Sequence, residues 1–121
     1  MLVKLSPQAV LTQIDEALEA VDARILTEEA KVDQIKEDYV KNGQEKAWFG
    51  RSKERWTNKF ENGDESSWCT PRWYAENCDT MLMSWRIRRE KVENIQRNVQ
   101  YAVKLGAEFV ELNETEIYLI F

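Results

Sequence analysis

The chain has 121 residues, of which 43% are hydrophobic and 32% charged, and its formal net charge at pH 7 is −5. This length suits one domain with one core, and five tryptophans and four phenylalanines supply enough apolar volume to exclude general disorder. The absence of histidine removes the commonest general base and the commonest metal ligand, and the acidic balance argues against a duplex-DNA binder.

The N-terminal residues do not have the pattern of a signal peptide. The stretch MLVKLSPQAVL holds a lysine and a proline inside a short apolar run, and no stretch of the chain approaches the roughly 18 apolar residues of a membrane span. We therefore expect a cytoplasmic protein without a membrane partner. Cys69 and Cys78 are expected to be reduced thiols, because a helical turn between them would separate them beyond disulfide reach.

A first long helix is expected over residues 7–41. Ser6 is a typical N-cap residue, Pro7 suits the first helical turn, and Asn42-Gly43 supplies a left-handed stop. Apolar residues recur along it at alternating spacings of three and four, which is typical of a heptad seam with a single polar member, Glu28. The seam positions are Leu11, Ile14, Leu18, Val21, Ile25, Glu28, Val32, Ile35 and Tyr39.

A second long helix is expected over residues 80–105. Asp79 and Thr80 are suitable caps, and Gly106 is a typical terminator. Its apolar stripe repeats at the same spacings and is interrupted by one polar residue, Arg88. The stripe positions are Met81, Trp85, Arg88, Val92, Ile95, Val99 and Ala102.

The polar residues of the two stripes predict an ion pair. Antiparallel packing of the helices would place Glu28 opposite residues 88–92, so we expect Glu28 to pair with Arg88 or Arg89. Desolvation offsets most of the attraction between buried charges. The pair would therefore fix the register of the helices rather than add stability.

The segment between the long helices is expected to contain a shorter aromatic helix over residues 44–60. Trp48, Ser52, Trp56 and Phe60 repeat every four residues there, although Gly50 weakens the pattern. Residues 61–78 read as a loop followed by a short helical turn, which Thr70-Pro71 would open.

The last segment, residues 108–121, changes its period and favours a small β-hairpin. Phe109–Leu112 and Thr115–Phe121 are rich in β-branched and aromatic residues. An alternative is a short helix over the last nine residues, because Asn113 followed by Glu116 fits a capping pattern.

These elements predict a mainly α fold in a single domain, residues 1–121. It would consist of a long, coiled-coil-like antiparallel helical hairpin, a shorter aromatic helix between its arms and a small C-terminal β-hairpin. Two helices cannot by themselves cover a seam of this length, so we also expect self-association into a homo-oligomer.

No motif in the sequence indicates catalysis. The glycines are too dispersed for a phosphate-binding loop, and two cysteines without histidine make a poor zinc site. Most helical carboxylates fall off the seam, as on a solvated face. We therefore expect no enzyme activity, no catalytic residue, no metal and no cofactor.

Two stretches concentrate basic and aromatic residues, KAWFGRSKERWTNKF at 46–60 and SWRIRREK at 84–91. Helical spacing sorts those of the first stretch into an apolar row and a neighbouring basic row, which favours a buried aromatic stripe flanked by basic side chains. A partner surface remains open, since Trp and Arg dominate interface energies. The candidate contact residues are Trp48, Arg51, Arg55, Trp68, Arg72 and Trp73.

For function, the sequence favours a non-catalytic protein-binding module, an inhibitor or adaptor that acts as a homo-oligomer. A phage or mobile-element origin would suit this role. The alternative is a sponge or sensor for a nucleotide, a cyclic nucleotide or single-stranded nucleic acid, held by Arg and Trp side chains at a subunit interface. The candidate residues for this alternative are Trp56, Trp85, Arg86 and Arg89.

Overall fold

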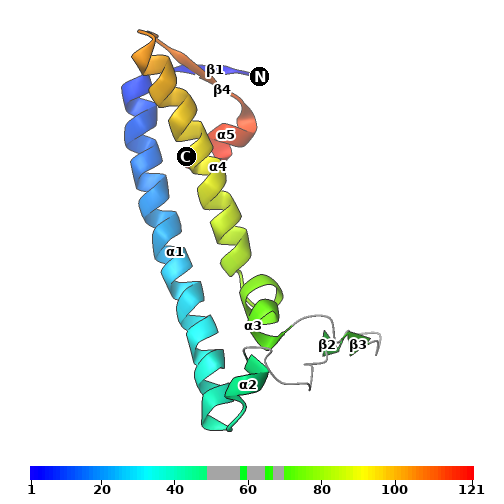
Figure 1. Cartoon of the computed structure of the whole chain (residues 1–121). Helices are drawn as coiled ribbons and strands as arrows, with labels where there is room; N and C mark the ends of the chain where they lie inside the picture. The colour runs from blue at the N-terminus through cyan, green and yellow to red at the C-terminus, as the bar shows by residue number, and fades with distance from the viewer. Residues whose placement is uncertain (49–57, 60–64, 67–69) are drawn as a thin grey trace. The chain divides into compact units, whose positions relative to one another are not determined.

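The structure is a computed structural model that describes residues 1–48, 58–59, 65–66 and 70–121. This part of the chain is mainly helical, as the sequence predicts, and two small antiparallel sheets of two strands each accompany the helices (Figure 1). In chain order the elements are β1 (Val3–Leu5), α1 (Pro7–Lys41), α2 (Glu45–Trp48), β2 (Asn58–Lys59), β3 (Glu65–Ser66), α3 (Pro71–Tyr74), the π-helical segment η1 (Ala75–Asp79), α4 (Leu82–Lys104), β4 (Val110–Leu112) and α5 (Glu114–Ile120).

The chain divides into two compact units, whereas the sequence predicts a single domain. The first unit consists of Met1–Ile25 and Ser84–Phe121, and the second of Leu26–Met83. Helix α1 contributes residues to both units. Residues at opposite ends of a 35-residue helix share few neighbours, because the helix rises about 1.5 Å per residue.

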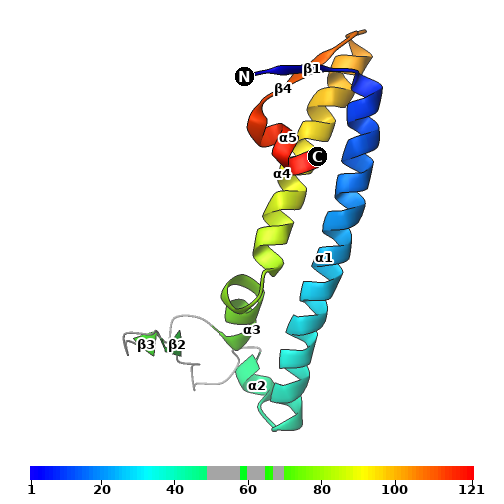
Figure 2. The same cartoon turned by 180° about the vertical axis from the view of Figure 1, so that it is seen from behind.

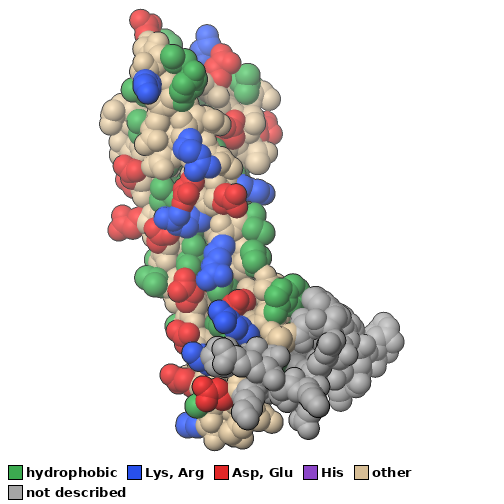
Figure 3. Space-filling view, in the orientation of Figure 1, with side chains coloured by type: hydrophobic (Ala, Val, Ile, Leu, Met, Phe, Trp, Pro, Cys, Tyr) green, Lys and Arg blue, Asp and Glu red, His purple; other side chains and the backbone are tan. Residues whose placement is uncertain are grey.

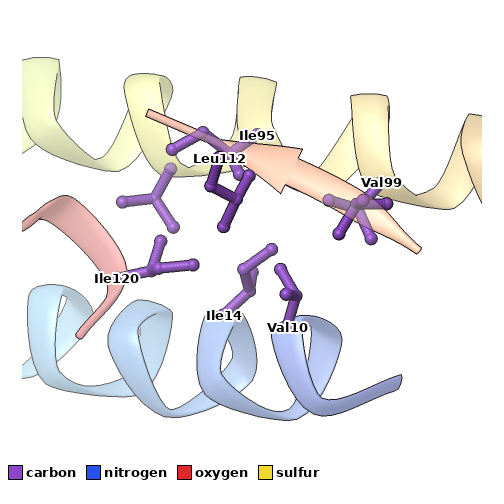
Figure 4. Close-up of a cluster of buried hydrophobic side chains, with 8 residues drawn as sticks. Val10, Ile14, Ile95, Val99, Leu112 and Ile120 are labelled. Atoms are coloured by element: carbon purple, nitrogen blue, oxygen red, sulfur yellow. The ribbon is translucent and has the colours of Figure 1, made fainter. Parts of the chain in front are cut away.

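In the first unit, α1 and α4 pack side by side and run antiparallel (Figures 1 and 2). The direction follows from the contacts, since Asp22 of α1 meets Arg89 early in α4, whereas Val10 shares a core with Val99 late in α4. Figure 4 shows the core side chains pointing toward one another. The buried cluster comprises Val10, Ile14, Val92, Ile95, Val99, Val110, Leu112 and Ile120.

The predicted seam of α1 is the face that the fold covers. Every seam position is buried or half-buried, including the polar Glu28, which is 6% exposed. The stripe of α4 agrees except at its start, where Met81 is 54% exposed and Leu82 is buried instead. The reason is that α4 begins at Leu82, so Met81 precedes the helix and does not share its face. Helix–helix packing is therefore present.

The predicted C-terminal hairpin is wrong. Strand β4 pairs with the N-terminal strand β1, with Val3 opposite Leu112 and Leu5 opposite Val110. The following residues form helix α5, which is the alternative that the capping pattern indicated. Strand β4 has an alternating pattern in which Val110 and Leu112 are buried, so its inner face completes the core of the first unit.

Helix α5 begins with a complete capping box. The Asn113 side chain accepts a 2.8 Å hydrogen bond from the Glu116 amide, and the Glu116 carboxylate accepts one of 3.0 Å from the Asn113 amide. Two otherwise unpaired donors at the helix start are thereby satisfied. The helix then carries Ile120, which is 2% exposed, into the core. Local capping thus outweighs the β-forming composition of this segment.

Both long helices end at glycines in the left-handed region, as predicted. Gly43 has φ 71° and Gly106 has φ 81°. The amides of Gln44 and Ala107 each bond a carbonyl five residues back, and the two glycine amides bond carbonyls three residues back. This double bonding is the Schellman arrangement, which satisfies carbonyls that the helix end would otherwise leave unpaired.

In the second unit, the expected aromatic helix over 44–60 is confirmed only at its start. Helix α2 covers Glu45–Trp48, and Asn58–Lys59 is a strand paired with Glu65–Ser66, so the helix does not continue to residue 60. Residues 49–57, 60–64 and 67–69 lie outside the described part. Trp48 is 2% exposed, and the centre of its ring lies 5.7 Å from the centre of the Tyr39 ring. Trp48 is therefore buried, as expected for a residue of the aromatic row.

The helical turn expected after Thr70 is present. The Thr70 hydroxyl accepts a 3.1 Å hydrogen bond from the amide of Trp73, with Pro71 at the first helical position of α3. The chain then continues into η1. Before α4, the Thr80 hydroxyl accepts a 3.3 Å hydrogen bond from the amide of Leu82, the first residue of the helix.

Glu28 and the arginines expected to pair with it have partners within their own units. The Glu28 carboxylate accepts from the Met81 amide at 3.2 Å and from the Lys31 ammonium at 3.0 Å. Arg89 contacts Asp22 and Glu93, and the Arg88 guanidinium lies over two aromatic rings. Glu28 and the arginines belong to different units, and the ion pair between them stays a prediction.

Candidate binding site

The first unit contains a pocket of about 300 Å³ between α1, α4 and α5. Small and apolar residues form much of its wall, including Ala17, Ala20 and Val21 of α1 and Leu119 of α5. Its polar and aromatic lining consists of Gln13, Glu16, Arg24, Trp85, Arg88 and Tyr118. We refer to it below as the arginine pocket.

A cluster of cations and aromatic rings forms one part of the arginine pocket. The Cζ atom of Arg88 lies 5.7 Å from the ring centre of Trp85 and 5.4 Å from that of Tyr118. The Cζ atom of Arg24 lies 5.7 Å from the Trp85 ring centre. These distances are within the range of attractive cation–π contacts. Trp85 thus contacts two guanidinium groups, and Arg88 contacts two rings.

Local helical geometry brings these side chains together. Trp85 and Arg88 are three residues apart on α4, so they occupy one face of the helix. Arg24 comes from the antiparallel α1, and Tyr118 from α5, which the capping box orients. The Gln13 side chain adds a 2.8 Å hydrogen bond to the carbonyl of Ile120 and so ties α5 to α1 beside the pocket.

The two arginines of the pocket are not neutralised by a neighbouring acid. Within residues 1–48, 58–59, 65–66 and 70–121, neither Arg24 nor Arg88 forms an ion pair. Arg89, by contrast, contacts Asp22 at 2.6 Å and also Glu93. On the face of the first unit seen in Figure 3, acidic and basic side chains intermix with apolar ones. Unpaired guanidinium groups inside a pocket therefore distinguish this place from the surrounding surface.

The structure brings only one residue of the nucleotide alternative into the arginine pocket. Trp85 lines it, whereas Arg86 and Arg89 do not, and Trp56 lies outside the described residues. Arg24 and Tyr118 are not among the residues predicted from the sequence, and Arg88 was predicted to pair with Glu28. The three-residue spacing of Trp85 and Arg88 was a usable signal, and the capping pattern of α5 was a second one.

Three of the six residues predicted to contact a partner protein lie in the described part of the chain. Trp48 is 2% exposed, so it is a core residue of the second unit and does not offer a contact surface. Trp73 is 40% exposed, and Arg72 forms a 3.0 Å ion pair with Glu76 on the same turn. The other three candidates, Arg51, Arg55 and Trp68, lie outside the described residues.

A second groove of about 400 Å³ lies between α4 and β4 of the first unit. Apolar residues of both elements line it together with Asn98, Glu111 and Glu116, and Phe109 at its side is 61% exposed. It contains no basic residue. Its chemistry is therefore opposite in charge to that of the arginine pocket.

The described residues give no indication of a metal centre or a membrane span. They hold no cluster of three potential metal ligands among His, Cys, Asp and Glu. Over the same residues, no helix combines the length and the apolar character needed to cross a bilayer. Cys78 is an exposed thiol, and Cys69 lies outside the described part.

The arginine pocket is therefore the place where charge, aromatic rings and a concave surface coincide in the described residues. Its chemistry has to be interpreted from its own residues. Comparison of the chain with protein-family models, with curated proteins and with solved structures finds no match.

Proposed function

We propose that the chain is a non-catalytic protein-binding module and that the arginine pocket is its recognition site. The observation that carries the proposal is the contact of Arg88 with the rings of both Trp85 and Tyr118. Trp, Tyr and Arg are the residue types that dominate the energies of protein interfaces. A guanidinium that already contacts two rings loses less conformational freedom when a partner binds, so the site is preorganised.

Exposed aromatic residues beside the pocket support the same proposal. Tyr118 is 74% exposed and Phe121 is 62% exposed, and both line the pocket. A partner that covered them would bury apolar surface that is now in water, at about 25 cal/mol per Å². The pocket would thus supply the polar centre of an interface, and these rings its apolar surroundings.

The role of an inhibitor or adaptor and the homo-oligomeric state belong to the same proposal. Tyr101, Val103 and Leu105, near the end of α4, are 63%, 45% and 69% exposed. Self-association that covered them would gain hydrophobic free energy. Partner binding and self-association would then use different residues of the first unit.

Affinity capture from cells that naturally make the protein tests the proposal. The wild-type chain is compared with Tyr118→Ala, whose side chain is exposed and not needed for the core, and with Trp73→Ala as a matched exposed aromatic control. We expect one protein to co-purify with the wild-type chain in stoichiometric amount. The amount captured should fall at least about tenfold with Tyr118→Ala and should be unchanged with Trp73→Ala. Failure of any protein to co-purify in that amount would contradict the function. Loss with Trp73→Ala alone would instead place the surface on α3.

A second candidate function, the binding of a nucleotide or single-stranded nucleic acid, is favoured by the same guanidinium and indole groups. Bases stack on Trp and Tyr, and phosphates bind Arg. A ligand of this class should quench the fluorescence of Trp85, and added salt should weaken its binding. The variant Trp85→Phe removes the reporting group and serves as the control. Unchanged fluorescence and melting temperature across a nucleotide panel would eliminate this candidate.

A further inference from the structure

The guanidinium groups of the arginine pocket have unused hydrogen-bond donors. A guanidinium that stacks on a ring uses its flat face, whereas its N–H groups point outward in its own plane. The Cζ atom of Arg88 lies over the Trp85 and Tyr118 rings, and within the described residues Arg88 forms neither a hydrogen bond nor an ion pair. Its in-plane donors match the two oxygens of a carboxylate, which binds guanidinium in a bidentate manner.

The charge of the lining selects among anions. Among the side chains of the lining, Arg24 and Arg88 contribute two positive charges and Glu16 one negative charge, which leaves a single net positive charge on these side chains. A carboxylate neutralises this charge. A phosphate monoester carries about −1.5 to −2 at neutral pH and would place surplus negative charge near Glu16. The lining therefore favours a carboxylate over a phosphate.

The size and apolar wall of the pocket indicate what accompanies the charged group. Its volume of about 300 Å³ lies at the lower end of ligand pockets. Ala17, Ala20 and Val21 form a wall of short side chains along α1, against which an apolar side chain of the ligand can pack. One acidic and one apolar side chain of a peptide fit this description.

We infer that the arginine pocket binds an acidic peptide segment, with an Asp or Glu carboxylate between Arg24 and Arg88 and a neighbouring apolar side chain against the α1 wall. This inference rests on the proposed function, since it names the chemistry that the partner protein presents. The acidic residue sets specificity through Arg88, and the apolar residue adds affinity. Tyr118, exposed at 74%, covers the bound segment from the side of α5.

A titration with defined probes tests the inference on the full chain. The probes are N-acetyl-Leu-Glu-amide, the neutral isostere N-acetyl-Leu-Gln-amide, inorganic phosphate and adenosine monophosphate. Two-dimensional NMR of the ¹⁵N-labelled protein follows the Trp85 indole N–H and the Arg88 Nε–H signals, with Trp85→Phe as the assignment control. We expect the Glu peptide to shift both signals in a saturable way, and the Gln peptide to bind about tenfold or more weakly.

Matched arginine variants establish whether the pocket is responsible. Arg88→Gln is expected to remove the preference for the Glu peptide, and Arg24→Gln, on an exposed side chain, to weaken it by a factor of about three or more. Arg97→Gln is the control, because Arg97 is on the same helix, is 61% exposed and lies outside the pocket. Each variant changes the net charge equally. If Arg88→Gln loses its folded spectrum, Arg24→Gln decides the result.

Three results would overturn the inference. Equal shifts by the Glu and Gln peptides, or no shift by either, would show that no carboxylate is recognised. Tighter binding of phosphate or adenosine monophosphate would assign the pocket to the nucleotide candidate. An equal loss with Arg97→Gln would reveal a general charge effect. If these results arise while Tyr118→Ala still abolishes partner capture, the acidic specificity fails and the protein-binding function stands. If the Glu peptide binds but no partner is captured, the acidic specificity of the pocket stands and the protein-binding function fails.

Discussion

Gln13 and Ile120 are 107 residues apart in the chain, and the Gln13 side-chain amide donates a 2.8 Å hydrogen bond to the main-chain carbonyl of Ile120. The bond fastens the end of α5 to α1. Both residues line the arginine pocket, and the Ile120 side chain is 2% exposed in the core. The position of Tyr118, two residues before Ile120, therefore depends on a polar contact as well as on hydrophobic packing.

Replacement of Gln13 by alanine should lower the free energy of unfolding by about 1 kcal/mol, because it leaves the Ile120 carbonyl without its partner. Alanine favours a helix at least as well as glutamine does, so α1 itself should not be weakened. Chemical denaturation measures the change. Gln8→Ala, at an exposed position of the same helix, is the control and should change stability little. Equal effects of the two substitutions would mean that the hydrogen bond adds nothing.

The capping box of α5 makes a second prediction. Asn113→Ala should lower the free energy of unfolding by about 1 kcal/mol, because the Glu116 amide loses its acceptor at the helix start. Asn113→Asp keeps an acceptor at the same place and should be nearly neutral. Thermal unfolding followed by circular dichroism distinguishes the two variants. A loss of similar size in both would assign the effect of Asn113 to something other than capping.

Glu28 is the third position at which a measurable effect is expected. Glu28→Ala removes the acceptor for the Met81 amide and should cost about 1 to 3 kcal/mol of unfolding free energy, because the amide directly before α4 loses its partner. Glu28→Gln keeps an oxygen acceptor and should cost less. Glu28→Leu should also destabilise. Denaturant titration of the three variants gives the order, and a leucine variant more stable than wild type would contradict the role of Met81.

Gly106 supports a prediction about helix termination. Its φ of 81° is strained for any residue with a Cβ, although no atom lies within 4 Å of the place that a Cβ would occupy. Gly106→Ala should therefore cost about 1 to 2 kcal/mol from backbone strain alone. Gly106→Asn should cost less, since asparagine tolerates this region better. Denaturation midpoints of the two variants test the order, and a neutral alanine variant would refute the strain argument.

The sequence predicts the long helices well because their signals are local and agree with one another. Ser6-Pro7, Gly43 and Gly106 place helix ends through backbone chemistry, and the three-four spacing of α1 identifies its buried face. The C-terminal segment shows the opposite case. There β-forming composition competes with a capping pattern, and the pairing of β4 with β1 joins chain ends that no local pattern connects.

The arginine pocket could be predicted only in part for a related reason. Trp85 and Arg88 share a helical face, which spacing alone reveals. The contacts of Arg24 and Tyr118 with this pair depend on tertiary packing of α1 and α5. Glu28 is a second example. Its polar side chain within an apolar seam suggested a charged partner. One of its hydrogen-bond donors is instead a main-chain amide, that of Met81, which no sequence pattern reveals.

The ion pair between Asp22 and Arg89 connects α1 and α4 within the first unit, yet it should contribute little to stability. The N–O distance is 2.6 Å, but the two side chains are 49% and 41% exposed, so solvent screens the attraction. A double-mutant cycle with Asp22→Asn and Arg89→Gln should give a coupling below about 1 kcal/mol that falls further in salt.

Ile14→Ala, at a fully buried position, should cost about 2 to 5 kcal/mol of unfolding free energy, while Leu105→Ala, at a position that is 69% exposed, should cost far less. Denaturation of the four single variants and the double mutant, at low and high salt, measures all these terms. A coupling as large as the Ile14 effect would mean that charge, rather than the apolar face of α1, holds these helices together.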